Sequence, residues 1–283
     1  DLTSPRTIRN IQEQFGFTFK KGLGQNFLTA RNILEEIVDA AEIESGVIEV
    51  GPGFGVLTSE LAQNSDKVVT IEIDERLIDV LDYTLAEYDN VKIINEDILK
   101  LDLKKVIDDE FNGEKVSIAA NLPYYITTPI ITKLLEEKLP IKNIVVMVQK
   151  EVAERMSAKP STKDYGAITV LCQYYTEPSI VANVPASLFV PPPKVDSAVL
   201  KLKVLDKPSV EVKDEGVFFR VVKAAFSQRR KTLLNCLSAN FPIPKDEIST
   251  LLESIGIAPS RRGETLSLEE FANIADTLLQ KIK

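Results

Sequence analysis

The stretch Glu49–Gly55, with the sequence EVGPGFG, decides the fold of this chain. It follows the short apolar run Val47–Val50 and precedes Leu57–Gln63, which has the character of a helix. Glycines in such a strand–turn–helix allow a tight turn and a close approach of the backbone to a ligand. Their spacing at i, i+2 and i+4 differs from the dinucleotide G-x-G-x-x-G, and the Gly-Lys-Ser/Thr of a phosphate loop is missing. The stretch therefore predicts an α/β fold that binds a cofactor without a pyrophosphate.

Further apolar segments follow this turn and alternate with helical segments. Near-continuous apolar runs between helices are typical of a parallel sheet that is covered on both faces. Thr29 is placed to cap the first of the helices. Residues 196–204 alternate between apolar and polar, which predicts a half-exposed strand near the sheet edge. The other expected strands are Val68–Ile73, Val91–Ile94, Val116–Ala120 and Ile144–Val148.

The C-terminal part of the chain has a purely helical pattern. It follows the polar, turn-prone segment Lys207–Gly216, and its last predicted helix starts at Ser267 with Glu270 in the capping-box position. The earlier segment Ala167–Tyr175 is compatible with either a helix or a strand. We therefore expect an α/β domain over residues 1–206 and a small all-helical domain over residues 207–283.

Composition excludes several classes of site. Histidine is absent from the 283 residues, and the two cysteines, Cys172 and Cys236, lie far apart. A Cys/His zinc site and a His-based triad are therefore excluded, and no metal site is expected. No apolar run approaches the length of a membrane span, and the N-terminus lacks the apolar core of a signal peptide. We expect a cytoplasmic protein with no membrane partner.

Charge is distributed unevenly along the chain, whose net charge is −8. Residues 35–119 hold 22 acidic and 7 basic residues, whereas residues 216–245 hold six basic residues and no acidic one. An acidic half joined to a basic patch suits a protein whose C-terminal part contacts phosphate. Arg229, Arg230 and Lys231 are the candidates for these contacts. The alternative is a solvated helix face.

Acidic residues accompany the glycine turn and end the next two predicted strands. Glu49 suits a positively charged methionyl amine, reached directly or through water. Glu72 follows the glycines by about 20 residues and can accept hydrogen bonds from both hydroxyls of a ribose. Asp97 ends the following strand and could accept a hydrogen bond from an adenine amino group. Because ligands of open α/β sheets bind at the carboxyl ends of the strands, these acids predict a site for S-adenosylmethionine.

The pentapeptide Asn121–Tyr125 (NLPYY) follows another predicted strand and belongs to the same edge. The side-chain oxygen of Asn121 and the backbone carbonyl of Leu122 or Pro123 can each accept one hydrogen of an amino group on a planar base. Those bonds pull the nitrogen toward tetrahedral geometry and localise its lone pair. Tyr124 can stack on the face of the base. The pattern predicts methylation of an exocyclic amine without a strong base, so the absence of histidine is no obstacle.

These motifs resemble those of the ribosomal RNA adenine N6,N6-dimethyltransferases, and within them the bacterial small-subunit branch associated with kasugamycin sensitivity. The resemblance runs from about residue 20 to the C-terminus. Besides the segments quoted above it is carried by Leu23–Leu28 (LGQNFL), Asn95–Asp97, Phe189–Ser197 (FVPPPKVDS), Phe226–Asn235 (FSQRRKTLLN) and Arg262–Leu266 (RGETL) with Glu270-Phe271.

The resemblance implies a Rossmann-like class I methyltransferase core and a helical C-terminal domain that contacts RNA or the ribosome. It implies that Phe189 stacks on the adenine face opposite Tyr124, and that Asn121, Leu122, Pro123 and Tyr124 form the rest of the catalytic site. It implies cofactor contacts from Asn26, Leu28, Gly51, Gly53, Glu72, Asp97 and Asn121.

The implied substrate is a pair of adjacent adenosines in a hairpin loop near the 3′ end of small-subunit (16S) rRNA. Each adenosine receives two methyl groups during ribosome assembly, and the enzyme is expected to act as a monomer. Two alternatives stay open: a large-subunit rRNA methyltransferase of the macrolide-resistance type, and an assembly or RNA-binding factor with secondary catalysis. Intact Gly51–Gly55 and Asn121–Tyr124 favour retained activity, and Phe226–Asn235 argues against the macrolide-resistance type.

Overall fold

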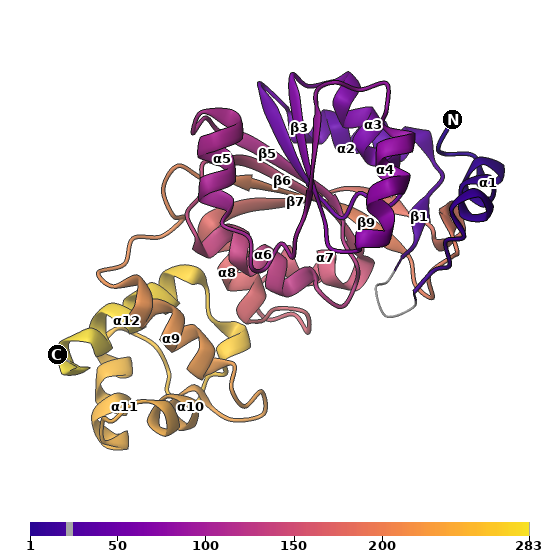
Figure 1. Ribbon diagram of the computed structural model, residues 1–283. Coiled ribbons are helices and arrows are strands. Elements are labelled where there is room, and N and C mark those ends of the chain that lie inside the picture. Colours follow the sequence, from indigo (N-terminus) through magenta and orange to yellow (C-terminus); the bar gives the residue numbers. More distant parts are fainter. Residues whose placement is uncertain (21–24, 283) are drawn as a thin grey trace. The chain divides into compact units, whose positions relative to one another are not determined.

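Figure 1 shows the computed structural model, which describes residues 1–20 and 25–282. Leu23 and Gly24 of the N-terminal motif lie outside these residues. The chain forms two compact units: Asp1–Ala153 with Pro178–Val204, and Glu154–Glu177 with Leu205–Lys283. The chain passes from the first unit to the second for the last time after Val204, close to the boundary expected after residue 206. The helical unit, however, also contains Glu154–Glu177, which the sequence analysis placed in the α/β domain.

A seven-stranded sheet forms the centre of the first unit. Its strands are β2 (Gly46–Val50), β3 (Lys67–Glu72), β4 (Val91–Asn95), β5 (Val116–Asn121), β6 (Ile141–Gln149), β7 (Thr176–Val184) and β9 (Ser197–Val204). Their order is β4-β3-β2-β5-β6-β9-β7, in which β4, β3, β2, β5 and β6 run parallel and β9 is antiparallel to β6. The expected parallel sheet around the glycine turn is confirmed.

Helices cover both faces of this sheet. All five residues of β2 are buried, and successive residues of a strand point to opposite faces. Apolar residues of α2 and α3 pack on one face, together with Val47, Ala119 and Val145. The helices of the unit are α1 (Pro5–Phe15), α2 (Arg31–Ala41), α3 (Val56–Gln63), α4 (Ile78–Thr84), α5 (Leu103–Phe111), α6 (Thr127–Glu136) and α7 (Lys150–Met156), which extends past the end of the first stretch.

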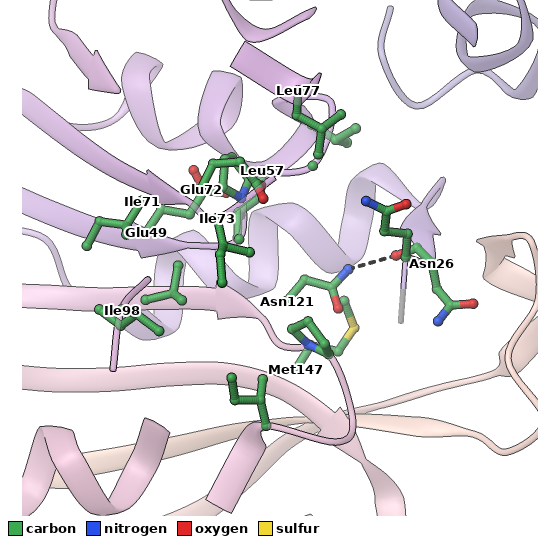
Figure 2. A pocket seen from close by; sticks show the side chains of 18 of the residues that line it. Asn26, Glu49, Leu57, Ile71, Glu72, Ile73, Leu77, Ile98, Asn121 and Met147 are labelled. Atoms are coloured by element: carbon green, nitrogen blue, oxygen red, sulfur yellow. Dashed lines mark hydrogen bonds between the residues drawn. The ribbon is translucent and has the colours of Figure 1, made fainter. Parts of the chain in front are cut away.

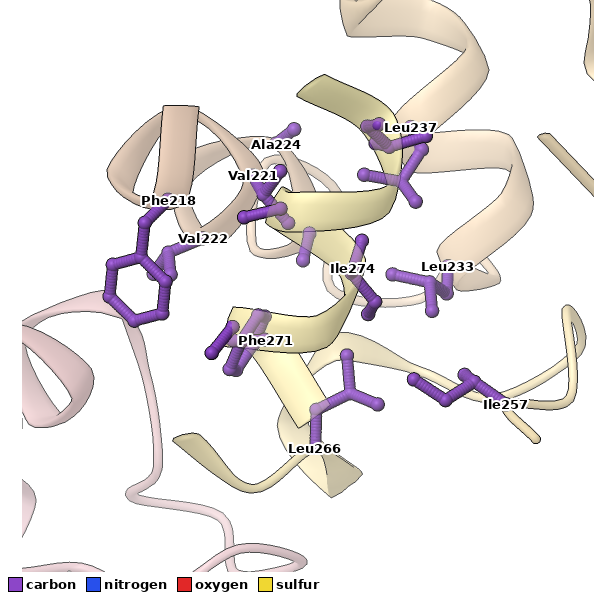
Figure 3. Close-up of a cluster of buried hydrophobic side chains, with 14 of the residues drawn as sticks. Phe218, Val221, Val222, Ala224, Leu233, Leu237, Ile257, Leu266, Phe271 and Ile274 are labelled. Atoms are coloured by element: carbon purple, nitrogen blue, oxygen red, sulfur yellow. The ribbon is translucent and has the colours of Figure 1, made fainter. Parts of the chain in front are cut away.

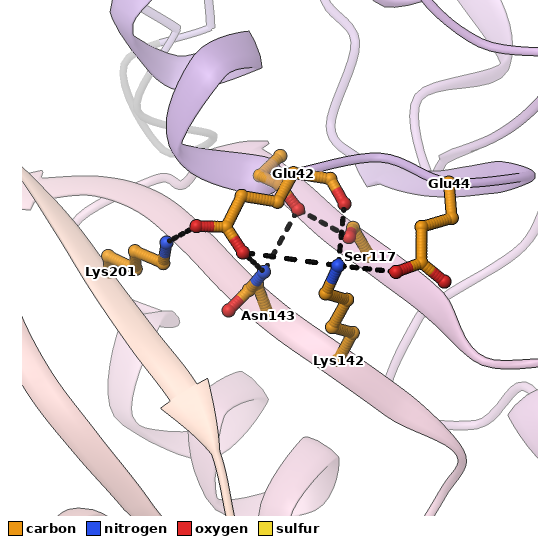
Figure 4. A network of polar contacts seen from close by, with 7 residues as sticks. Glu42, Glu44, Ser117, Lys142, Asn143 and Lys201 are labelled. Atoms are coloured by element: carbon orange, nitrogen blue, oxygen red, sulfur yellow. Dashed lines mark hydrogen bonds and ion pairs between the residues drawn. The ribbon is translucent and has the colours of Figure 1, made fainter.

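A polar network holds the C-terminus of α2 against the three strands β5, β6 and β9 (Figure 4). The carbonyl oxygen of Ala41 accepts hydrogen bonds from Ser117 Oγ at 2.6 Å and from Asn143 Nδ2 at 3.1 Å. Glu42 forms ion pairs with Lys201 at 2.8 Å and with Lys142 at 3.9 Å. The network fixes α2 at one end of the sheet, while Leu34 and Ile37 of the same helix line the pocket described below.

Three local expectations need correction. Thr29 does not cap α2: the N-cap residue is Ala30, and the Thr29 hydroxyl donates to the carbonyl of Leu188 at 2.8 Å. Ser197–Leu200 of β9 are all buried, and only the second half of the strand alternates in burial. β9 lies between β6 and β7, so the edge strand on this side of the sheet is β7, which was not predicted; the other edge is β4. β7 contains Pro178, and proline in a strand is confined to edges and bulges.

The second unit is helical and has its own apolar core. It contains α8 (Ala167–Tyr175), α9 (Glu215–Ala225), α10 (Leu233–Asn240), α11 (Lys245–Ser254) and α12 (Leu268–Ile282). Figure 3 shows Phe271 and Ile274 of α12 among residues of α9 and α10. The predicted capping box is confirmed: Glu270 N–H donates to Ser267 Oγ, and Ser267 N–H donates to Glu270 Oε1, each at 3.1 Å.

Candidate active site

The glycine turn between β2 and α3 has a backbone that only glycine adopts easily. Gly51 and Gly53 have φ angles of 71° and 58°. A Cβ on Gly53 would lie 2.5 Å from the Phe27 ring. That ring stacks on Phe54 of the same turn with a centroid distance of 4.4 Å. The turn is therefore held tightly against β1 (Phe27–Leu28). Because Gly51 and Gly53 have no side chains, they leave the space beside the turn open.

A pocket of about 1020 Å³, part of which is open to solvent, lies beside this turn (Figure 2). It occupies the carboxyl ends of β2, β3 and β5 and the loop after β4, where ligands of open α/β sheets bind. Ile73 and Ile98, each directly after an acid, supply apolar walls that the sequence analysis had not assigned. Every predicted cofactor-binding residue lines this pocket: Asn26, Leu28, Gly51, Gly53, Glu72, Asp97 and Asn121.

Two buried carboxylates lie at the base of the pocket. Glu49 is 1% exposed, and its Oε2 accepts hydrogen bonds from the hydroxyls of Thr58 and of Thr70, the latter at 3.1 Å. Burial raises the pKa of Glu49 to about 7 against the effect of these bonds. Glu72 Oε1 accepts the backbone N–H of Asp74 at 2.8 Å, and burial also raises the pKa of Glu72 to about 7. A bound cation or bound hydroxyl donors would therefore stabilise the charged form of both carboxyl groups.

The charge of the pocket selects the class of cofactor. Asp97 lines it together with Glu49 and Glu72, and its Oδ1 accepts the backbone N–H of Leu99 at 2.9 Å. Among the described residues that line the pocket, none is lysine or arginine. A phosphate would lack a cationic partner here, whereas the sulfonium and ammonium groups of S-adenosylmethionine match the carboxylates. The residues present therefore fit S-adenosylmethionine.

Asn121 ends β5 and faces the pocket with a defined orientation. Its Nδ2 donates to the backbone carbonyl of Asn26 at 3.2 Å (Figure 2). This bond fixes the amide so that Oδ1 is its remaining acceptor. The carbonyl of Pro123 already accepts from Ile126 N at 3.2 Å and from Thr127 Oγ1 at 3.3 Å. Leu122 and Pro123 are the two candidates for the second carbonyl that accepts an amino hydrogen of the base. Because the Pro123 carbonyl is already engaged, the geometry favours the carbonyl of Leu122.

The aromatic residues near this turn have different environments. The Tyr124 hydroxyl lies 2.6 Å from Ser197 Oγ, and Tyr124 does not line the pocket. Tyr125 does line it and is 58% exposed. No role was predicted for Tyr125, although it is the second tyrosine of the pentapeptide Asn121–Tyr125.

Phe189 lies elsewhere than the resemblance implied. It belongs to β8 (Phe189–Val190), which pairs antiparallel with β1, so that Phe189 is opposite Leu28. Its side chain is 3% exposed and packs in the core cluster that includes Leu28 and Val199. In this structure the ring is a core residue, and stacking on a base would require it to leave that cluster. The stacking role stays a prediction.

The candidate RNA-binding residues lie in the second unit, between α9 and α10. Arg229 forms an ion pair with Glu264 at 3.4 Å and donates to the backbone carbonyl of Lys163. Arg230 and Lys231 are exposed, and the N–H of Lys231 donates to the carbonyl of Gln228 at 2.9 Å in a tight turn. Arg229 thus helps to hold the loop, while its two neighbours present their charges to solvent.

Two further features describe the site and its surroundings. Within residues 1–20 and 25–282, no group of Cys, Asp and Glu side chains is arranged to hold a metal ion. None of the helices in the described part of the chain has the length and apolar character needed to span a bilayer.

The fold and the pocket together define a Rossmann-like class I methyltransferase that uses S-adenosylmethionine. Comparison with known proteins gives the family. A model described as ribosomal RNA adenine dimethylase matches residues 16–280, and the chain belongs to this family.

Relatives and solved structures agree with this assignment. The chain is 54% identical to the ribosomal RNA small subunit methyltransferases A of Bacillus mycoides and Bacillus anthracis, over 99% of this chain and 98% of each relative. The crystal structure of a dimethyladenosine transferase from Plasmodium falciparum is 30% identical, with a TM-score of 0.76 over 90% of this chain and 98% of that one. That of the 23S rRNA methyltransferase ErmE is 27% identical, with a TM-score of 0.68 over 90% of this chain and 100% of that one.

Proposed function

We propose that this protein dimethylates the N6 of two adjacent adenosines in a hairpin loop near the 3′ end of small-subunit rRNA, within the assembling small ribosomal subunit. The observation that carries the proposal is the pairing of an anionic, phosphate-excluding pocket with an oriented Asn121 amide at its edge. The small-subunit target is supported by the names of relatives that are 54% identical over nearly the whole chain. We further infer that the protein acts as a monomer in the cytoplasm.

The acceptor site works by orientation and hydrogen bonding. Bound S-adenosylmethionine supplies the methyl group. Asn121 Oδ1 and the Leu122 carbonyl each accept one hydrogen of the N6 amino group, which localises the nitrogen lone pair toward the pocket. Tyr124 packs against the base. The proton on N6 becomes acidic once the methyl group is attached, so it is lost to water without a dedicated base.

The second unit binds the RNA through its phosphates. Arg230 and Lys231 contact phosphates, and Arg229 holds their loop while adding its own charge. These contacts are independent of base identity, so the choice of adenosine rests with the amino-group acceptors in the first unit.

One experiment tests the proposal directly. The protein is incubated with methyl-labelled S-adenosylmethionine and small subunits that lack the modification, and the labelled nucleotides are mapped. We expect N6,N6-dimethyladenosine at two adjacent positions of the small-subunit rRNA and none in large subunits treated in parallel. Label in the large-subunit rRNA, or label at a single isolated adenosine, would contradict the proposal. Asn121→Ala, compared at the same short incubation time, serves as the control with reduced labelling.

A further inference from the structure

The direction of the Asn121 amide depends on one backbone carbonyl. Its Nδ2 donates to the carbonyl of Asn26 at 3.2 Å, which leaves Oδ1 to accept. If that carbonyl moved away, the amide could rotate by half a turn and present its NH2 group to the N6 amino group. Two donors would then face each other, and the acceptor function would be lost. The position of Asn26 is therefore part of the acceptor site.

Asn26 is anchored on both sides along the chain. After it, Phe27 and Leu28 pair with β8. Before it, the side chain of Gln25 bridges two partners: its Oε1 accepts the N–H of Lys20 at 3.0 Å, and its Nε2 donates to Asp74 Oδ2 at 3.2 Å. The glutamine amide accepts at one atom and donates at the other, whereas an ionised glutamate of the same shape only accepts and could not make both bonds.

Asp74 is itself firmly held. It is buried, and Arg76 donates to its Oδ1 through Nε at 2.9 Å and to its Oδ2 through Nη2 at 2.5 Å. The Arg76 guanidinium lies 4.7 Å from the centre of the Phe17 ring. This guanidinium keeps the pKa of Asp74 below its usual range, so the carboxylate is charged and can accept at any working pH. The N–H of Asp74 donates to Glu72, which connects the arrangement to the cofactor carboxylate.

We propose that Gln25 and Asp74 are positioning residues for methyl transfer: their hydrogen bond holds the Asn26 carbonyl where it orients the Asn121 amide toward the target amine. The inference rests on the proposed function of Asn121 and extends it to Asp74, which does not line the pocket, and to Gln25, which lines it and acts here through its bond to Asp74. It also explains why a glutamine precedes Asn26.

The principal test is the substitution Gln25→Glu. It keeps the size of the side chain but replaces the donor that faces Asp74 by a second carboxylate oxygen. We expect the single-turnover rate of methyl transfer, at saturating RNA and cofactor, to fall by about ten- to a hundredfold, the range for a hydrogen bond to a charged group. The dissociation constant of RNA should change by less than about threefold. That of S-adenosylmethionine, whose pocket Gln25 lines, is measured on the same variant, so that a loss of cofactor binding is separated from the loss of rate at saturation.

The reversed pair supplies the decisive rescue. In Gln25→Glu/Asp74→Asn the NH2 group of the new asparagine takes the place of Oδ2 and donates to the new glutamate, whose other oxygen still accepts from Lys20. The bond from Arg76 Nη2 to Oδ2 is lost, whereas that from Nε to Oδ1 is kept. We expect this double variant to recover part of the rate lost in Gln25→Glu. Glu75→Gln is the matched control, because it removes an exposed carboxylate from the same turn and should leave the rate unchanged. A double variant as slow as Gln25→Glu, or slower, would overturn the proposal.

A second readout is independent of catalysis. In the cofactor-free protein, the side-chain NH2 signal of Asn121 is assigned by ¹⁵N NMR through its loss in Asn121→Ala. This signal should shift or broaden in Gln25→Glu and return in the double variant, and an unchanged signal would overturn the proposal. Should Gln25→Glu fail to fold, Gln25→Ala gives the same comparison without the added charge. If the wild-type protein methylated no small-subunit adenosine, the proposed function would fail while the NMR result still decided the positioning link.

Discussion

Burial, and not a charged neighbour of opposite sign, sets the pKa of Glu49. Its pKa is raised from 4.5 to about 7, first by burial and against two threonine hydroxyls that favour the charged form. A pKa that is higher in the folded than in the unfolded chain stabilises the fold below the unfolded value. This contribution is lost as the pH rises through the folded value, here between about 4.5 and 7. The cofactor-free protein therefore bears a cost at neutral and alkaline pH that a bound cation relieves.

We expect Glu49→Gln to raise the free energy of unfolding of the cofactor-free protein by about 1–3 kcal/mol at alkaline pH, and by much less near pH 5. The neutral amide removes the cost of burying a charge. The same change should weaken S-adenosylmethionine, whose ammonium loses an anionic partner. Urea unfolding at both pH values, with calorimetric titration of the cofactor, measures both effects. Equal destabilisation at the two pH values would contradict the pKa argument.

Asn121→Ala should lower the rate of methyl transfer by about ten- to a hundredfold at saturating cofactor, with little change in RNA affinity. The hydrogen bond from N6 strengthens as that nitrogen becomes tetrahedral, so its loss is felt mainly in the transition state. Single-turnover assays and RNA binding measured on the same variant separate the two quantities. Asn121→Asp keeps an acceptor oxygen in either rotation of the side chain, so it should be faster than Asn121→Ala although it cannot donate to Asn26. An Asn121→Ala variant as fast as the wild-type protein would show that the acceptor on Asn121 is unimportant.

Among the elements, β1 and β8 form a short antiparallel pair. It joins residues 27–28 to residues 189–190, near opposite ends of the first unit's sequence. It brings Phe27, which packs against the glycine turn, next to Val190 of the Pro-rich segment. The register also places Phe189 in the core. Sequence reasoning could not supply this pairing, because two-residue strands have too short a pattern to show which side is buried.

Because of this packing, Phe189→Ala should lower the free energy of unfolding by about 3–5 kcal/mol, the usual cost of removing a buried phenylalanine ring. Phe189→Leu, which keeps most of the volume, should cost far less. Denaturant unfolding of both variants measures the difference. Unchanged stability of Phe189→Ala, together with a higher KM for RNA, would instead support the stacking role that the resemblance implied.

The loop between α9 and α10 divides its three basic residues between two tasks. Replacing Arg230 and Lys231 by alanine should weaken RNA binding and reduce the slope of log affinity against log salt concentration by about 1.4–1.8, because each phosphate contact contributes about 0.7–0.9. Cofactor affinity and the melting temperature should be unchanged. Arg229→Ala should lower the melting temperature as well, because its contacts to Glu264 and Lys163 are lost. An unchanged salt slope in the first variant would remove the loop from the RNA interface.

At the scale of the whole molecule, the sequence predicted which residues line the pocket better than it predicted how the chain divides into two units. The carboxyl ends of parallel strands meet at one edge, so the strand-end acids and Asn121 could be brought together from the order of the segments alone. Periodicity shows which side of a helix is apolar, but not which core that side joins. Hence α8 and the neighbouring Tyr165 could not be assigned to the second unit, where Tyr165, Val170 and Tyr174 share a core with α9 and α12.

The discontinuous second unit has a consequence for the order in which the protein is made. Its core needs Tyr165 and Tyr174 from the middle of the chain and Phe271 and Ile274 from near the end. Synthesis runs from the N-terminus and is slow compared with the formation of local structure. The apolar side of α8 can pack on α9 after about fifty more residues have been translated, but its contacts with α12 must wait for about a hundred. For that interval the core of the second unit is incomplete, and a chain that ended at residue 206 would leave the apolar side of α8 without α9 or α12.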